Sequence, residues 1–105
     1  MPARYILSPR AVQNLLDIWN YIKDQSSASI ADQVELSIRE RMIFLAGSPG
    51  AGHRRKDLKD LTDEDVRFFG VYSYLIAYSA DTKPLQITSI IHGRRDVTQV
   101  LKERT

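Results

Sequence analysis

The sequence has no cysteine. Its absence excludes disulfide bonds, thiolate nucleophiles and zinc sites built from cysteine ligands. Histidine is almost as scarce, because His53 and His92 are the only two, and neither belongs to a His-Glu-x-x-His spacing. We therefore expect no metal site and no other cofactor.

Long apolar runs are missing as well. No run approaches the roughly 18 residues that a membrane-spanning helix needs, and residues 1–7 turn polar too early for a signal peptide. We expect a cytoplasmic protein without membrane contact. The 105 residues are 43% hydrophobic and 27% charged, which is the size and composition of one small globular domain covering residues 1–105.

A large excess of charge of either sign is also absent. The net charge of +2 is too small to indicate a continuous phosphate-binding track. Basic residues gather at positions 53–56 and at Arg94 and Arg95, with acidic side chains between them at positions 60–65. This segregation favours a partner of mixed charge, and direct nucleic-acid binding is not expected.

The first part of the chain is predicted to be a strand followed by a helix. Residues 4–7 have aromatic and β-branched character and lead to Ser8 and Pro9, a helix start with serine as N-cap and proline at the first helical position. Apolar residues then recur at three- and four-residue steps up to Ile22. The apolar stripe consists of Val12, Leu15, Leu16, Ile18, Trp19 and Ile22.

A second helix is predicted to begin at Ser29, which with Asp32 resembles a capping box, and to end at Gly47 as a left-handed cap before Pro49. Its apolar stripe consists of Ile30, Val34, Ile38, Met42 and Leu45. The two helices should form an antiparallel hairpin, with Trp19 and Met42 in the core.

Residues 47–65 have no clear periodicity, and a connection of this length usually binds a partner or moves. Its Gly-Ala-Gly sequence at 50–52 lacks the lysine spacing and the preceding strand of a phosphate-binding loop, so we exclude nucleotide binding.

Three strands are predicted at residues 66–71, 74–79 and 85–91, with a tight turn at Tyr72 and Ser73. Alternation in the last strand should place Leu85, Ile87 and Ile91 under the helices and Gln86, Thr88 and His92 on the opposite face, left open for a partner. The fold class is therefore α+β, in the order β-α-α-β-β-β, with a helical hairpin on one face of a mainly antiparallel sheet.

The stretch from residue 86 to 96 is the first candidate site, because His92, Arg94 and Arg95 follow a strand and Gly93 frees the backbone there. Metal-independent RNA cleavage needs an acid, a base and cations. His92, Arg67, Arg94 and Arg95 could supply them, together with Arg54 or Arg55.

Against cleavage, Asp57, Asp60 and Asp96 would repel phosphate or pair with the arginines. A purely structural interpretation also stands: Arg67 can bridge the sheet to an acidic loop residue, and His92 can bond a backbone carbonyl. Exposed tyrosines and phenylalanines on the strands could anchor a partner's extended segment, and the candidates are Phe69, Tyr72, Tyr74 and Tyr78.

Several short segments, in this order along nearly the whole chain, resemble the ParE branch of the RelE/ParE toxin superfamily. They are Leu7-Ser8-Pro9-Arg10-Ala11, Ile18-Trp19-Asn20-Tyr21-Ile22, Leu45-Ala46-Gly47-Ser48-Pro49, Gly52-His53-Arg54-Arg55-Lys56-Asp57-Leu58, Arg67-Phe68-Phe69, Tyr74-Leu75-Ile76-Ala77-Tyr78 and His92-Gly93-Arg94-Arg95-Asp96. The resemblance implies a cytoplasmic bacterial type II toxin of the plasmid stabilisation kind, held inactive by a small antitoxin. It also implies a fold shared with ribosome-dependent RNases, but inhibition of DNA gyrase instead of RNA cleavage.

We therefore predict a gyrase-inhibiting toxin that forms a hetero-oligomer with its antitoxin. The residues predicted to bind partners are Arg54, Arg55, Arg67, Phe69, Tyr74, Tyr78, His92, Arg94 and Arg95. The alternative is a RelE-like endoribonuclease in which His92, Arg67, Arg94 and Arg95 act in catalysis. A third hypothesis is an interaction domain that has lost toxicity.

Overall fold

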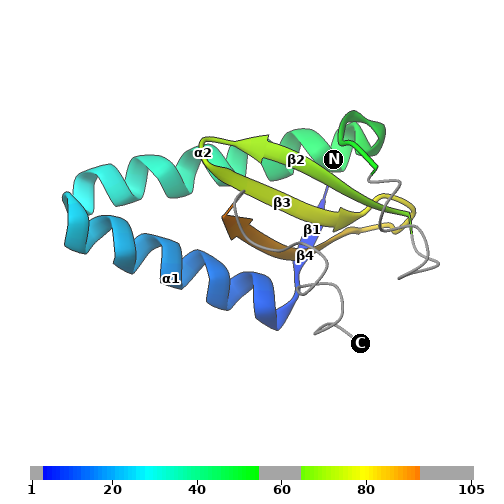
Figure 1. The fold of residues 1–105 in the computed structure, drawn as a ribbon. Coiled ribbons are helices and arrows are strands. Elements are labelled where there is room, and N and C mark those ends of the chain that lie inside the picture. The colour runs from blue at the N-terminus through cyan, green and yellow to red at the C-terminus, as the bar shows by residue number, and fades with distance from the viewer. Residues whose placement is uncertain (1–3, 55–64, 93–105) are drawn as a thin grey trace.

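The computed structural model describes residues 4–54 and 65–92. The elements are β1 (Tyr5–Leu7), α1 (Pro9–Gln25), α2 (Ala28–Gly47), the 3-10 helix η1 (Pro49–Ala51), β2 (Val66–Val71), β3 (Tyr74–Ser79) and β4 (Leu85–His92). Helices α1 and α2 form a hairpin that packs on one face of the sheet (Figure 1). This arrangement confirms the predicted α+β class and the predicted order of elements.

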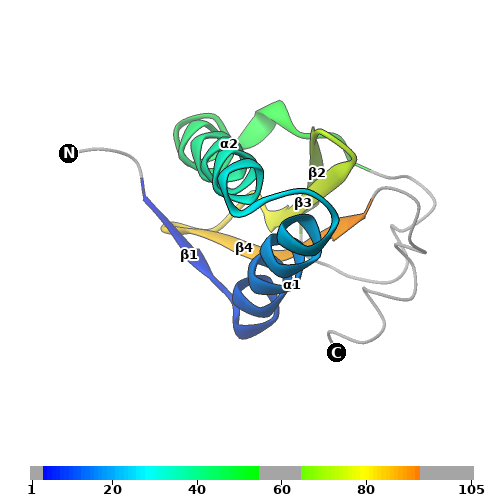
Figure 2. The ribbon, with the colours of Figure 1, turned by 90° about the vertical axis from the view of Figure 1, so that its left-hand side faces the viewer.

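The sheet has four strands in the order β1-β4-β3-β2. Strand β3 pairs antiparallel with both β2 and β4, whereas β1 pairs parallel with β4. Figure 2 shows β1 at one border of the sheet, with the helices on one side. The sheet is therefore mainly antiparallel, as predicted, with one parallel border strand.

The start of α1 is confirmed, but the bounds of α2 differ from prediction. The Ser8 hydroxyl accepts a hydrogen bond from the Ala11 amide at 3.0 Å, and Pro9 opens the helix. The N-cap of α2 lies two residues earlier than predicted, because Ser27, and not Ser29, accepts a hydrogen bond from the Ile30 amide at 3.1 Å. Gly47 belongs to α2, and among the described residues no glycine has positive φ, so the predicted left-handed cap is wrong.

The core lies between the helical hairpin and the sheet. Its fully buried members are Ala11, Leu15, Ile38, Met42, Leu45, Val71, Ile76, Tyr78, Leu85, Ile87 and Ile90. Met42 is confirmed as a core residue.

The core prediction for Trp19 is wrong. This residue is only half-buried, at the edge of the hairpin, and its indole Nε1 donates to Asp32 at 2.8 Å. Val12, Leu16 and Ile30 are 52%, 53% and 41% exposed, because each helix buries a narrower stripe than its apolar residues define.

A β-bulge in β4 reverses the predicted alternation of its side chains. Ala77 pairs with Ser89 while its neighbour Tyr78 pairs with Ile87, so Thr88 is an additional residue on β4. Beyond the bulge Ile90 packs under the helices, and Ile91 joins a cluster on the opposite face. The predictions that Ile91 lies under the helices and His92 on the opposite face are therefore wrong.

The opposite face was also expected to be open for a partner. Val66, Phe68, Ala77 and Ile91 form an apolar cluster there, and all are less than 9% exposed. This part of the face is therefore not a free surface.

Candidate functional site

One carboxylate joins two of the predicted arginines at the start of β2. Arg54 Nε donates to Asp65 Oδ1 at 2.7 Å, and Arg67 Nε donates to the same oxygen at 3.3 Å. The hydrogen bond from Arg54 lowers the pKa of the Asp65 carboxyl, against the opposing effect of its partial burial, and Arg67 lowers it further. The arginines therefore hold Asp65 ionised, as the structural interpretation of Arg67 predicts.

Arg67 and Tyr78 also fasten the segment after α2 to the sheet. Arg67 Nη1 donates to the carbonyls of Gly50 and Gly52 at 3.0 and 3.3 Å. The Tyr78 hydroxyl donates to the Pro49 carbonyl at 2.6 Å and accepts from the Gly52 amide at 2.9 Å. A Cβ atom at Gly52 would collide with the Tyr78 hydroxyl and ring, which is why the position holds glycine.

Tyr78 is thus placed inside the molecule, with no exposed surface. Burial raises the pKa of its phenol. It cannot touch a partner in this conformation, and its hydroxyl is already used in the two bonds to the segment after α2.

Aromatic side chains continue from Arg67 along the same border. Phe69 lies two residues further along β2, and its ring is 5.8 Å from that of Phe44, which is 49% exposed on α2. Tyr72, at the turn between β2 and β3, is 68% exposed, and its hydroxyl is 3.2 Å from that of Ser37. We refer to Arg54, Arg67, Phe69, Phe44 and Tyr72 as the β2–α2 surface.

Tyr72 has a φ of 55°, a conformation that glycine or asparagine adopts far more easily than an aromatic residue. Prediction from sequence placed Tyr72 among candidate anchors but missed Phe44, because Phe44 lies between the core residues Met42 and Leu45 and resembles one of them.

Tyr74 and His92 form a second, separate cluster. Their rings meet edge to face at 5.7 Å, at the end of the β3–β4 pair. Burial raises the pKa of Tyr74, and Tyr21 from α1 contributes to the rise. His92 therefore packs against an aromatic ring on the helix side of the sheet.

His92 and Arg67 lie beside opposite ends of β3. Both residues pair with β3, from opposite sides. His92 on β4 pairs with Tyr74, whereas Arg67 on β2 pairs with Tyr78, four residues further along β3. Four residues of strand span about 13 Å. A proton donor on His92 therefore lies too far from Arg67 for both to act on one phosphate.

The other predicted site residues, Arg55, Arg94 and Arg95, lie outside the described residues, as does the predicted stretch beyond His92. Within residues 4–54 and 65–92, no group of three histidine, aspartate or glutamate side chains could hold a metal ion. None of the helices in this part of the chain is both long and apolar enough to cross a bilayer.

The helical hairpin on one face of a short mixed sheet defines a small α+β protein, with arginines and aromatics along one border of the sheet. Among solved structures, the chain is similar to one described as "Chromosomal ParDE TA system from P. aeruginosa", with a TM-score of 0.69 at 17% identity. The match covers 87% of this chain and 96% of the other.

The family model described as "ParE toxin of type II toxin-antitoxin system, parDE" matches residues 5–97. The chain belongs to this ParE toxin family and is the toxin component of a type II toxin–antitoxin system. No sequence among curated proteins matches it.

Proposed function

We propose that this toxin arrests growth by binding DNA gyrase and blocking supercoiling, and that a cognate antitoxin neutralises it in the cytoplasm by forming a hetero-oligomer. The alternative within the same superfamily is ribosome-dependent RNA cleavage. The two mechanisms require different sites, since an RNase needs an acid–base pair beside cations and an inhibitor needs a binding surface.

The observation that carries the proposal is that Arg67 and His92 both make contacts within the protein and lie far apart. Arg67 donates to Asp65, Gly50 and Gly52, so its guanidinium is committed to holding the segment after α2. His92 packs on Tyr74 at the other end of β3. These contacts support a toxin in which Arg67 and His92 serve structure and recognition instead of RNA cleavage.

The β2–α2 surface has the composition of a protein interface. Arginine and aromatic residues are enriched in such interfaces, and here the rings of Phe69, Phe44 and Tyr72 lie along one border with the exposed side chain of Arg54. The left-handed backbone conformation of Tyr72 costs about 1 kcal/mol of folding free energy. Among the described residues, Tyr72 is the large hydrophobic residue with the most exposed side chain. We infer that this surface, with Phe44 near its centre, contacts gyrase.

The test is inhibition of gyrase supercoiling by the purified toxin and by two alanine variants on α2. Phe44→Ala should weaken inhibition by about tenfold or more, as expected for an anchor residue. Leu36→Ala is the control, because Leu36 is 59% exposed on the same helix and lies eight residues, about 12 Å along the axis, before Phe44. Its inhibition should stay within about twofold of wild type.

The same preparations are added to a translation extract to test the alternative function. Cleavage of mRNA by the wild type that disappears in His92→Ala, with no effect on supercoiling, would establish the RNase and refute the gyrase proposal. Equal inhibition by the wild type and Phe44→Ala would leave gyrase as the target but exclude the β2–α2 surface as its contact.

A further inference from the structure

Most arginines that the structure describes already have an interaction partner within the protein. They are Arg4, Arg10, Arg39, Arg54 and Arg67. Arg41 on α2 is the exception, because no hydrogen bond, ion pair or ring contact joins it to any residue in the described part of the chain. Its guanidinium is therefore available to a partner.

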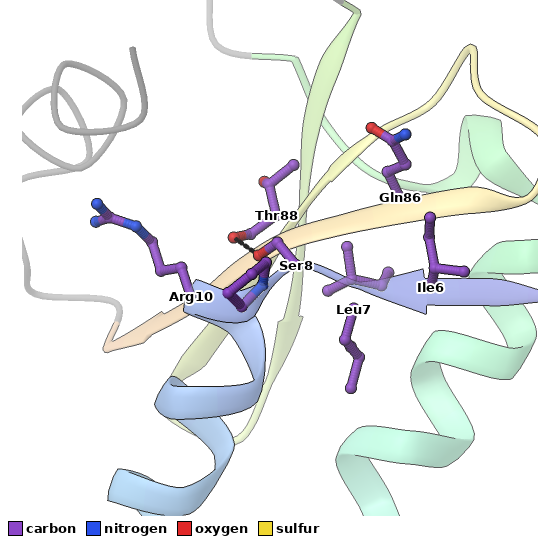
Figure 3. A pocket seen from close by; sticks show the side chains of 8 residues that line it. Ile6, Leu7, Ser8, Arg10, Gln86 and Thr88 are labelled. Atoms are coloured by element: carbon purple, nitrogen blue, oxygen red, sulfur yellow. Dashed lines mark hydrogen bonds between the residues drawn. The ribbon is translucent and has the colours of Figure 1, made fainter.

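The pocket beside β1 offers no comparable group (Figure 3). It has a volume of about 450 Å³ and is lined by residues 6–10 and 86–88. The Ser8 hydroxyl donates to the Thr88 carbonyl at 2.7 Å, and Arg10, the charged residue of the lining, has a partner of its own. The polar side chains that could have held a charged ligand there are therefore already in use.

The spacing of residues along α2 explains why Arg41 has no carboxylate beside it. Side chains three and four positions apart meet on a helix. Around Arg41 these positions, 37, 38, 44 and 45, hold serine, isoleucine, phenylalanine and leucine. Arg39, by contrast, has Glu35 four residues before it and pairs with it at 3.1 Å. Arg41 is also exposed, so it has no ion pair to break before it can bind.

Arg41 lies among the residues of the β2–α2 surface. Ser37 precedes it by four residues and Phe44 follows it by three, so the three side chains share one face of α2. The Ser37 hydroxyl is 3.2 Å from that of Tyr72, and the Phe44 ring is 5.8 Å from that of Phe69. Arg41 is therefore flanked by the two contacts that join α2 to β2 and the following turn (Figure 1).

The surroundings of Arg41 favour a carboxylate over a phosphate as its ligand. A guanidinium binds either group through two parallel N–H···O bonds. Binding along DNA, however, takes several cations in a row. Glu40 is next to Arg41, and Arg39 is turned away by about 200° around the helix and is already paired. A single free arginine among aromatic rings is instead typical of the centre of a protein interface.

We propose that Arg41 binds a carboxylate on the surface of gyrase and is a specificity-determining residue of the toxin. This inference rests on the proposed contact between the β2–α2 surface and gyrase. The rings of Phe44 and Tyr72 supply apolar contact on either side, and the guanidinium fixes the orientation of the complex. A target that lacks the carboxylate leaves the arginine desolvated without a partner, so the toxin discriminates against it.

Inhibition of gyrase supercoiling by two arginine-to-glutamine variants is the test. Arg41→Gln should weaken inhibition by about tenfold or more, because the carboxylate of gyrase is left without its partner. Arg39→Gln is the matched control, since it removes the same charge from the same helix at a position facing another way. Long-range attraction to gyrase changes equally in both variants, so Arg39→Gln should inhibit within about twofold of wild type.

Binding to gyrase in the absence of DNA separates a carboxylate from a phosphate. The difference between wild type and Arg41→Gln should persist without DNA and should shrink as KCl is added, because salt screens an ion pair. The urea denaturation curves of the two proteins should coincide, since the exposed Arg41 has no partner in the described part of the toxin. A difference that occurs only with DNA present would assign Arg41 to a phosphate and overturn the inference.

Failure of this inference is distinguishable from failure of the proposed function. A wild-type toxin that neither binds nor inhibits gyrase would overturn both. Inhibition that is weakened in Phe44→Ala but equal in wild type and Arg41→Gln would overturn this inference alone. Loss of antitoxin binding by Arg41→Gln, with its inhibition of gyrase unchanged, would assign the arginine to the antitoxin and would overturn the inference as well.

Discussion

At the scale of single residues, the side chains that looked most like partner anchors divide into internal and external ones. Tyr78 and Arg67 hold the carbonyls of residues 49, 50 and 52. Tyr72 instead faces outward on the β2–α2 surface, as does Phe44, which was not among the predicted anchors. Residue type alone could not separate the two groups, because a tyrosine on a strand has the same sequence signature on either face.

The Tyr78 hydroxyl should contribute measurably to stability. Tyr78→Phe leaves the Pro49 carbonyl and the buried Gly52 amide without their partner, which should lower the free energy of unfolding by about 2 kcal/mol. Tyr72→Phe is the control, since its hydroxyl is exposed, and it should change that free energy by less than about 0.5 kcal/mol. Urea denaturation measures both, and equal stabilities of the two variants would contradict the internal role of Tyr78.

The ion pairs of Asp65 make the free energy of unfolding depend on pH in the acidic range. Its folded pKa lies below the unfolded value of about 4. The stabilisation is therefore complete above that unfolded pKa and is lost as the pH falls through the lower folded pKa. Denaturation curves between about pH 5 and about pH 2 should show a smaller loss of stability for Asp65→Asn than for wild type. Parallel losses in the two proteins would show that Asp65 does not couple folding to pH.

At the scale of elements, the bulge in β4 decides which way His92 faces. The start of α1 supports it: Ser8 donates to the Thr88 carbonyl, and the Asn14 amide oxygen accepts from the Ile90 amide at 3.0 Å. The Thr88 hydroxyl also donates to the Ala77 carbonyl at 3.0 Å. The backbone groups of β4 that lose their cross-strand partners at the bulge therefore have hydrogen-bond partners. Their satisfaction allows the bulge to occur inside a packed sheet.

Two N-cap serines allow the contribution of this support to be measured. Ser8→Ala removes both a helix cap and the bond to Thr88, so it should cost about 2 kcal/mol of stability. Ser27→Ala removes a cap alone and should cost about 1 kcal/mol. Thermal or urea unfolding of the two variants gives the comparison. A Ser27→Ala loss as large as that of Ser8→Ala would mean that the bond to the bulge contributes nothing.

Much of the element order could be predicted from sequence, because it depends on local periodicity. The predicted bounds 66–71 and 74–79 coincide with β2 and β3, and the Ser8–Pro9 helix start is confirmed. The orientation of residues 88–92 could not be predicted, because the bulge is satisfied by side chains that lie some 75 residues or more away in sequence, at Ser8 and Asn14. Strict alternation was the only local rule available, and it gave the wrong face for His92.

At the scale of the whole molecule, the candidate residues are dispersed over several places. Arg54, Arg67 and Phe69 share the β2–α2 surface, Tyr74 and His92 lie at the far end of β3, and Tyr78 is internal. Arg41 was not among the predicted sites, since an exposed arginine on a helix belongs to no motif and its place beside β2 depends on how α2 packs on the sheet. Membership of the toxin family, by contrast, followed from the ordered segments of the sequence.

Supercoiling of relaxed plasmid by purified gyrase, with the toxin titrated in and antitoxin then added, tests the central claim most directly. We predict that the toxin blocks supercoiling and that an equimolar amount of antitoxin restores it. Undiminished supercoiling at every toxin concentration, from a preparation that still arrests growth when expressed, would contradict gyrase as the target.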